Sequence, residues 1–473
     1  MDDDVAAPTG PVFCNRTLNL RSIRAIGYDL DYTLVHYHVD EWEGAAFAHA
    51  TTALASRGWP VGGLDFDPAA YTQGLVFDLE LGNIVKATRF GYVVRASHGT
   101  RPLPFDELRR CYAGTFVDLA EARFAFMNTM FSLSQASLFA QLIDLCDAGA
   151  LPARAGYLDV WRTLEDALNE AHTQGELKAL IRSDPARFVD PDPRLGLALA
   201  DQFHAGKKLL LVTNSDWGYT QAMAEYTLDP VLPGGLRWRD LFALVIVEAA
   251  KPRFFSGRNA VFRLVDEAGG LFEPHRGPLR EGEVYLGGDA LAVERSLGLA
   301  GDQLLYVGDH LFGDVHVSKS VLRWRTALIM RELEGEVAER AAFDADQRRL
   351  DELMVRKAVV DDEVAQLRLA RQRLRRRYAP AGRSGRGLEE ALAEATARSA
   401  ALDDELGPLA QRAGALSNPA WGPLMRAGSD KSLFARQVER YADVYTSRVS
   451  NLGAVTPYAY LRASRTTLPH DAV

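Results

Sequence analysis

The chain has 473 residues, long enough for two or three domains, and its 47% hydrophobic and 25% charged residues are typical of a globular protein. Its formal net charge of -9 argues against a general nucleic-acid coat and for a soluble partner. The three cysteines, Cys14, Cys111 and Cys146, are odd in number and far apart, which excludes a disulfide framework and a zinc ribbon. A reducing compartment is therefore expected.

The sequence also argues against a membrane protein. No segment reaches the roughly 18 uninterrupted apolar residues that a membrane span needs. Residues 1–4 include three aspartates where a secretory signal would be basic, and no apolar stretch follows them. We expect a cytoplasmic protein that binds neither membranes nor nucleic acid.

Four short apolar runs predict buried parallel strands, because each is followed by polar, glycine-containing or acidic residues. They cover residues 23–28, 208–212, 241–247 and 303–307. Helix-compatible stretches separate the last three, which is typical of alternating βα units. The carboxyl ends of such strands share one edge of the sheet, where ligands bind. The polar residues that follow the four strands are expected to meet there.

A second domain is predicted between the first two strands, because about 175 residues are too many for one crossover. Residues 71–97 alternate aromatic and aliphatic side chains between glycines, which predicts a β-meander. Residues 119–182 have helical spacing. This part of the chain is therefore expected to be an α+β insertion.

Beyond Arg331 the pattern predicts an antiparallel helical hairpin or a protruding coiled coil. Leu353, Val360, Leu367 and Leu374 recur every seven residues, and a second apolar series at spacings of four and three runs over 388–406. A turn signal separates them at 379–387. The arginine-rich run over 371–377 is interpreted as a solvated helix face.

The pattern Asp29-Leu-Asp31-Tyr-Thr directly follows the first strand. One carboxylate of such a pair can attack an electrophile while the other protonates the leaving group, which suits phosphoryl transfer through an aspartyl-phosphate. Alone the pattern is weak, because an aspartate before a helix is a common cap. It becomes informative only with the residues that follow the other strands.

Three further polar groups follow the later strands in order. Thr213 and Asn214 offer donors at a helix N-terminus, which suits a phosphate. Lys251 can place a cation on phosphoryl oxygens, and Asp309 and Asp314 stand five apart in a glycine-punctuated loop suited to Mg²⁺. Each has an ordinary alternative, namely a helix cap, a solvated lysine or a turn. Together the four groups predict a phosphoryl-transfer site that needs Mg²⁺.

These residues and the segments around them resemble the haloacid dehalogenase superfamily and, within it, the cytosolic purine 5′-nucleotidase family (IMP/GMP-preferring). The matching segments are residues 15–37, 74–99, 212–219, 250–255, 308–314 and 432–470, while 336–427 match in helical character only. Nearly the whole chain is thus covered.

The resemblance implies an α/β fold, with a Rossmann-like haloacid dehalogenase core that has a parallel sheet. A large inserted α+β cap domain would lie between the first and second core strands, and a helical hairpin towards the C-terminus. The expected parts are the core, 1–35 and 186–332, the cap, 36–185, the hairpin, 333–427, and a C-terminal segment, 428–473, on the core or on a subunit interface.

The resemblance also implies roles for the site residues. Asp29 would be the nucleophile, and Asp31 the general acid and then the base for the incoming water. Mg²⁺ would be held by the carboxylates of Asp29 and Asp309 and by the backbone carbonyl of Asp31. The residues that would bind or support the phosphoryl group are Thr213, Asn214, Lys251 and Asp314.

Substrate contacts are implied for Phe131, His172, Lys178 and Asn169. A core aromatic and an ordinary surface helix are the structural alternatives for these residues. Glu165, Asn169 and Thr173 stand where the family has an arginine, an aspartate and a tyrosine. An acid in place of a cation reverses the sign of the local field, so another phosphate ester stays an alternative substrate.

We therefore expect a Mg²⁺-dependent 5′-nucleotidase that hydrolyses nucleoside 5′-monophosphates of the IMP/GMP type, with phosphotransfer to a nucleoside as a further activity. The alternatives are a phosphatase for another small phosphate ester and a non-catalytic interaction protein on the same fold. The resemblance also implies a homo-oligomer, a dimer or a tetramer.

Overall fold

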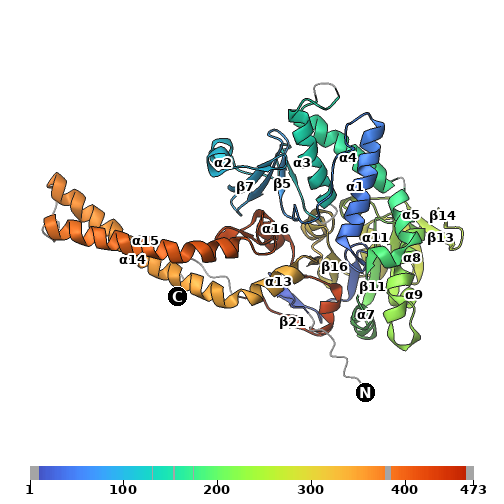
Figure 1. The fold of residues 1–473 in the computed structure, drawn as a ribbon. Helices are drawn as coiled ribbons and strands as arrows, with labels where there is room; N and C mark the ends of the chain where they lie inside the picture. The colour runs from blue at the N-terminus through green and yellow to red at the C-terminus, as the bar shows by residue number, and fades with distance from the viewer. Residues whose placement is uncertain (1–9, 130–131, 153–154, 174, 379–384, 465–473) are drawn as a thin grey trace, which may run out of the picture. The chain divides into compact units, whose positions relative to one another are not determined.

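Ten strands form the central sheet, in the order β1-β20-β17-β16-β3-β11-β12-β15-β13-β14. The last two, β13 and β14, lie at the right of Figure 1. The computed structural model describes residues 10–129, 132–152, 155–173, 175–378 and 385–464. The strands from β20 to β15 in this order run parallel, and the others pair antiparallel at the two edges. In sheet order they span Phe13–Cys14, Val444–Thr446, Arg325–Ile329, Leu304–Gly308, Ala25–Tyr28, Lys208–Val212, Phe242–Val247, Glu283–Gly287, Val261–Asp266 and Leu271–Pro274. The expected α/β class with a parallel sheet is confirmed.

The four predicted strands are neighbours at the centre of this sheet, as β16, β3, β11 and β12. Every residue of β3 and β16 is buried, as expected for parallel strands covered on both faces. The backbone N–H of Asp29 donates to the carbonyl oxygen of Val307 at 2.9 Å. This register brings the ends of β3 and β16, and the acidic residues that follow them, to the same level.

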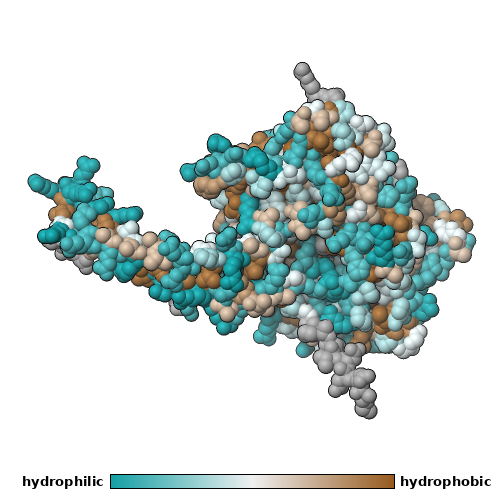
Figure 2. Space-filling model, viewed as in Figure 1, coloured by the Kyte–Doolittle hydropathy of each residue, from teal (hydrophilic) through white to brown (hydrophobic). Residues whose placement is uncertain are grey.

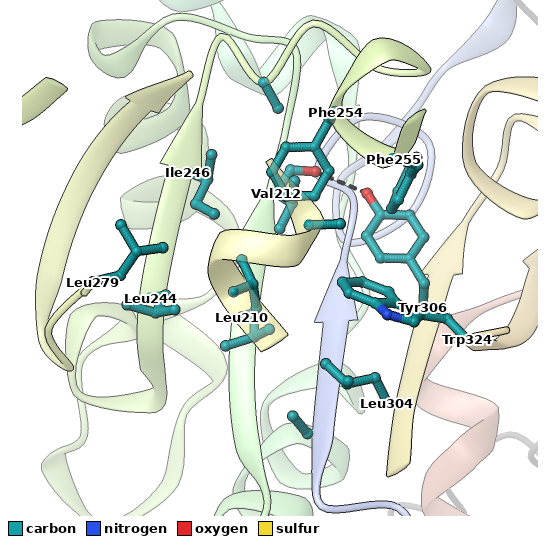
Figure 3. Close-up of a cluster of buried hydrophobic side chains, with 14 of the residues drawn as sticks. Leu210, Val212, Leu244, Ile246, Phe254, Phe255, Leu279, Leu304, Tyr306 and Trp324 are labelled. Carbon is teal, nitrogen blue, oxygen red and sulfur yellow. Dashed lines mark hydrogen bonds between the residues drawn. The ribbon is translucent and has the colours of Figure 1, made fainter. Parts of the chain in front are cut away.

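A hydrophobic cluster fixes the central strands against one another (Figure 3). The ring of Tyr306 on β16 passes over Gly27 on β3, where a Cβ would lie 2.9 Å from the ring. The Tyr306 hydroxyl then donates to the carbonyl oxygen of Val212 on β11 at 2.9 Å. Three adjacent strands are thus tied together just below the edge where the polar residues lie.

Helices follow the strands of the parallel sheet, and three of them are capped at their start by side chains, those of Asp216, Asp289 and Ser432. The Asp216 side chain accepts from the backbone N–H of Tyr219 at the start of α8, and Asp289 does the same for Ala292 at α11. The helices that accompany the sheet are α7 (Leu195–His204), α8 (Trp217–Thr227), α9 (Trp238–Leu241), α10 (Arg253–Ser256), α11 (Ala290–Leu297), α12 (Val317–Leu322) and α16 (Leu433–Tyr441). The next helix in the chain after β17 is α13 (Leu333–Ala342).

Between β3 and β11 the chain forms a second, antiparallel sheet in the order β8-β7-β6-β5-β9. These strands span Arg101–Pro102, Val93–His98, Asn83–Ala87, Val76–Asp78 and Phe124–Phe126. The accompanying helices are α1 (Val39–Ser56), α2 (Phe105–Tyr112), α3 (Leu133–Asp147), α4 (Tyr157–Thr173), α5 (Glu176–Ser183) and α6 (Pro185–Phe188). The ends of this insertion are joined by the pairing of β4 (His36–Tyr37) with β10 (Val189–Asp190).

Parts of both sheets differ from the sequence-based expectation. The helical spacing from residue 119 onward misses β9, a three-residue strand that pairs with the distant β5. The hairpin of β13 and β14, which extends the central sheet, was not predicted either. Pairs of very short strands complete the fold, β18 (Arg426–Ala427) with β19 (Asp430–Lys431) and β2 (Leu18–Asn19) with β21 (Tyr460–Leu461).

The chain divides into two compact units, Met1–Glu334 with Leu424–Val473, and Gly335–Pro423. We call the second the hairpin unit. Its helices α14 (Asp344–Arg376) and α15 (Gly385–Gly414) are antiparallel, because Val364 packs near Leu388 and Leu353 packs near Leu406. Leu374, expected in the same seam, is 41% exposed instead. The proposed domain boundaries at residues 35, 185, 332 and 427 stay predictions.

Across the described ranges, the helices are all too short or too polar to cross a lipid bilayer.

Candidate active site

Three carboxylates meet at the carboxyl ends of β3 and β16. Asp29, Asp309 and Asp314 are buried, and each offers an oxygen within 4.8 Å of the others. Asp29 and Asp309 directly follow their strands, and Asp314 lies on a π-helical turn over Leu311–His316. The turn bends back so closely that a Cβ at Gly308 would lie 2.4 Å from Asp314 Oδ2, so only glycine fits there.

Lys251 joins two of these carboxylates. Its Nζ lies 2.7 Å from Asp29 Oδ2 and 2.8 Å from Asp314 Oδ1, and it donates to the Tyr306 hydroxyl at 3.0 Å. Only 4% of the Lys251 side chain is exposed. The lysine is therefore a buried cation among acids, which is different from the solvated surface group that a lone lysine usually is.

The backbone around Lys251 is held by Asn214 and is locally strained. The Asn214 Oδ1 accepts from the Lys251 N–H at 2.7 Å, and Asn214 Nδ2 donates to the Lys251 carbonyl at 3.2 Å. Glu248 and Ala250 have φ angles of 47° and 56°, in a region that costs a non-glycine residue about 1 kcal/mol or more. The amide expected to face a phosphate thus positions the lysine here.

The electrostatics of the cluster are dominated by burial. Burial raises the pKa of Asp29 to about 7 although Lys251 opposes this, and burial together with Asp29 raises the pKa of Asp309 well above its ordinary range. Burial disfavours the Lys251 cation, but Asp29 and Asp314 hold its pKa well above the ordinary value. Three acids thus surround one ammonium group, which leaves the cluster short of positive charge.

This donor set fits a divalent cation. It consists of carboxylate oxygens alone, which hard cations such as Mg²⁺ prefer, and a cation would relieve the repulsion among the acids. The nearby Thr129 hydroxyl, from the insertion, donates to Asp309 Oδ2 at 3.1 Å. The cluster is thus touched by both the central sheet and the insertion.

Asp31, two residues after Asp29, is held by two hydroxyl groups. Tyr37 donates to Asp31 Oδ1 at 2.5 Å, and Ser215 donates to Asp31 Oδ2 at 2.6 Å. Lys178, on α5 of the insertion, donates to the Ser215 Oγ at 3.0 Å. The second carboxylate of the Asp29 pair is therefore oriented by partners from three parts of the chain.

Thr213 lies directly after β11 and is buried. Its N–H donates to the Ile246 carbonyl at 2.9 Å, and its Oγ1 accepts from the Ser215 N–H at 3.0 Å. The predicted groups from the four strands are thus brought to one edge of the sheet, as the strand-end argument requires.

The expected substrate contacts fall into two groups. Phe131 and the side chain of His172 lie outside the described residues. Asn169 is exposed on α4, and Lys178 reaches the site through Ser215. Their role in binding a base stays a prediction.

The sequence analysis missed four supporting residues, namely Tyr37, Thr129, Ser215 and Tyr306. Ser215 follows Thr213 and Asn214 directly, so its position was visible although its partner was not. Tyr37 stands six residues after Asp31, a spacing that has no meaning until the loop is folded. Tyr306 reads as an ordinary buried strand residue.

The comparisons with known proteins show the family to which the chain belongs. The model of the 5′ nucleotidase family matches residues 12–473. The chain belongs to the 5′ nucleotidase family. One curated relative is the human 5′-nucleotidase domain-containing protein 2, which is 27% identical over 98% of this chain and 85% of its own length. Another is a 5′-nucleotidase domain-containing protein of Dictyostelium discoideum, which is 27% identical over 97% of this chain and 74% of its own length.

Solved structures add little. L-2-haloacid dehalogenase from Xanthobacter autotrophicus is 16% identical, covers 67% of this nucleotidase-family chain and 83% of its own, and has a TM-score of 0.23. At that TM-score the likeness carries no argument. Family membership itself confirms the resemblance to 5′-nucleotidases and the expected enzyme class, a phosphoric monoester hydrolase of the 5′-nucleotidase kind.

Proposed function

We propose that the chain hydrolyses nucleoside 5′-monophosphates in a Mg²⁺-dependent reaction that passes through an aspartyl-phosphate on Asp29. The observation that carries the proposal is the contact of Lys251 with both Asp29 and Asp314, beside an Asp31 carboxylate held by two hydroxyl groups. A positioned nucleophile, a cation for the phosphoryl oxygens and a separate acid are what phosphoryl transfer needs.

In the first step an Asp29 carboxylate oxygen attacks phosphorus, and the bond from phosphorus to the 5′ oxygen breaks. Asp31 gives its proton to that oxygen, so the nucleoside leaves as a neutral alcohol. The hydrogen bonds from Tyr37 and Ser215 hold the Asp31 carboxyl in place for this transfer.

In the second step water attacks phosphorus and Asp31 takes its proton, which releases inorganic phosphate and restores Asp29. A nucleoside hydroxyl in the place of this water would give phosphotransfer from the same intermediate. Lys251 and the hydroxyl of Thr213 bind the phosphoryl oxygens in both steps.

Mg²⁺ would be held by the carboxylates of Asp29 and Asp309 and by the Asp31 carbonyl, and when bound it would offset the repulsion between these acids and the phosphate dianion. Asp314 keeps Lys251 in position beside it. The raised pKa values of Asp29 and Asp309 support this reading, because they express a cluster in which negative charge is costly.

The proposed preference for purine nucleotides rests on the family resemblance at Phe131, His172 and Lys178. We propose IMP and GMP as the preferred substrates and a homo-oligomer in the cytoplasm as the working form. Glu165, Asn169 and Thr173 depart from the purine pattern, so the alternative of another phosphate ester is tested alongside.

The nucleophile is tested with Asp29→Asn. We expect phosphate release to fall by at least about 10³-fold with the unfolding midpoint unchanged or raised, because the amide cannot form the acyl phosphate and the buried charge is removed. Asp302→Asn, at an exposed position away from the site, is the matched control and should keep full activity. An Asp29→Asn protein with wild-type turnover would show that another group attacks phosphorus.

Substrate and metal are tested together with a panel of IMP, GMP, CMP, UMP and sugar phosphates, with Mg²⁺ and with a chelator. We expect the highest kcat/KM for the purine nucleotides and turnover near background with the chelator. If a sugar phosphate had the highest kcat/KM, the proposed substrate would be wrong, but the proposed aspartyl-phosphate mechanism would still hold. Full turnover in the presence of the chelator would contradict the proposed requirement for Mg²⁺.

A further inference from the structure

The helix α14 of the hairpin unit carries a second stripe, on the face opposite its contact with α15. The buried contact is made by Leu353, Val364 and Leu367. The second stripe, which we call the outer stripe, repeats at alternating spacings of three and four residues, the spacing of a helix-pairing seam. It consists of Glu352, Val355, Val359, Asp362, Gln366, Leu369, Arg373 and Arg376.

Three of the eight residues of the outer stripe, Val355, Val359 and Leu369, are apolar and open to solvent. Val355 and Val359 are 67% and 68% exposed, and Leu369 is 36% exposed. Figure 2 shows the hairpin unit as a mostly hydrophilic surface with apolar areas along it. Exposed branched residues at seam spacing on a long helix mark an interaction surface better than single exposed residues do.

The charges of the hairpin unit are separated along its length. Residues 364–398, at the tip, contain nine arginines and three glutamates, a formal charge of +6. Residues 344–363 and 399–414 contain ten acidic and five basic residues, a formal charge of -5. Each half of the hairpin therefore complements the other half of a second copy.

Several of these charges have no ion-pair partner within the described part of the chain. Arg368, Arg373, Arg376 and Arg377 are among them in the tip half, and Asp351 and Asp362 in the other half, whereas Arg371 and Arg375 bind Glu389. Glu352 has only a 3.8 Å contact with Arg349. Except for Arg368, which flanks the buried contact with α15, these unpaired groups lie on or beside the outer stripe.

We propose that two copies of this chain associate through the outer stripes of α14, antiparallel, about a two-fold axis at residue 364. This register sets Val359 against Leu369 of the second copy and Asp362 against Gln366. Towards the ends it sets Glu352 against Arg376 and Asp351 against Arg377. Because the interface is isologous, every pair occurs twice.

Charge selects this arrangement over the others. A parallel pair would place two tips of formal charge +6 side by side, whereas the antiparallel pair places each tip on an acidic half. From Glu352 to Arg376 the stripe is about 36 Å long at 1.5 Å per residue, and its outer pairs are exposed, so the association should weaken with salt. A polyanion would be attracted by the tip alone and would not explain the exposed valines of the acidic half, Val355 and Val359.

The test is sedimentation velocity of the full chain at low salt with charge-reversed variants. Arg376→Glu with Arg377→Glu should halve the mass of the assembly, and Asp351→Arg with Glu352→Arg should do the same. An equimolar mixture of the two proteins, or all four substitutions in one chain, should restore the mass because the opposite signs face each other again. Phosphate release should be unchanged in every variant.

Cysteine cross-linking fixes the register. A Val359→Cys protein mixed with a Leu369→Cys protein should give a disulfide between the two chains, whereas Val359→Cys alone should not. A mass that no charge reversal changes, a four-fold variant that stays at half mass, or a link between two copies of position 359 would each overturn the proposal. Reversal that abolishes only binding of a short RNA, with the mass unchanged, would assign the tip to a polyanion instead.

Discussion

Each proposed catalytic side chain is held by a residue from another part of the chain. Lys251 is fixed by Tyr306 through its ammonium group and by Asn214 through its backbone, and Asp31 is fixed by the Tyr37 hydroxyl. Such contacts set the orientation of a reacting group before substrate binds, which reduces the cost of reaching the transition state.

Tyr306→Phe tests this support at a single atom. The change removes the hydroxyl that accepts from Lys251 and leaves the Val212 carbonyl without its donor. We expect kcat to fall about tenfold and the free energy of unfolding to fall by about 1–3 kcal/mol, the range for a lost buried hydrogen bond. Steady-state kinetics and urea unfolding measure the two effects.

Tyr285→Phe is the control for Tyr306→Phe. Its hydroxyl accepts from the Arg280 N–H at 2.8 Å, and it belongs to the same hydrophobic cluster. Its loss should lower stability without slowing catalysis. If both variants kept wild-type kcat, Tyr306 would be a packing residue and nothing more.

The helices α14 and α15 of the hairpin unit are stabilised by the apolar residues that pack between them. Leu388 is 1% exposed and packs with Val364, Leu367 and Leu392. Leu388→Ala should destabilise this unit by about 2–5 kcal/mol, because it leaves a cavity in a small core. Thermal unfolding followed by circular dichroism should show an earlier loss of helix with kcat unchanged.

Met354→Ala serves as the exposed control for Leu388→Ala, since Met354 is 53% exposed on the same helix pair. It should shift the transition little. A Leu388→Ala protein that unfolds at the wild-type temperature would mean that this seam does not stabilise the helices.

The helices and strands also differ in how well the sequence predicts them. Long apolar runs such as Lys208–Val212 and Leu304–Gly308 appear at the expected residues, because burial on both faces demands them. Phe124–Phe126 is a strand only because β5 offers it a partner, and Leu374 is exposed although its heptad position is apolar. Short elements take their structure from the neighbour and not from their own pattern.

For the molecule as a whole, pH should act through His36, which lies where the two ends of the insertion pair. Burial, with Arg448 and Arg331, lowers the pKa of His36 to about 3. The unfolded chain, with a histidine pKa near 6.5, then binds the proton more strongly, so stability is lost as pH falls from about 6.5 towards 3. Between pH 7 and pH 5 this one group should remove about 2 kcal/mol.

Urea unfolding at pH 7, 6 and 5 measures this dependence. His36→Gln should remove this loss, so its stability relative to wild type should rise as pH falls from 7 to 5, whereas the control His204→Gln, at an exposed position, should keep the pH dependence of wild type. Parallel curves for wild type and His36→Gln would contradict the assignment.

The sequence by itself determined the parallel sheet, the insertion after the first strand and the groups that meet at the strand ends, because buried strands and the polar residues after them are local patterns. The tertiary structure alone decided what those groups contact. Asn214 holds the Lys251 backbone, and Tyr37 and Ser215 hold Asp31, through hydrogen bonds that depend on distances across the fold. Local spacing carries no information on such distances, since they arise only when strands far apart in the chain pack in register.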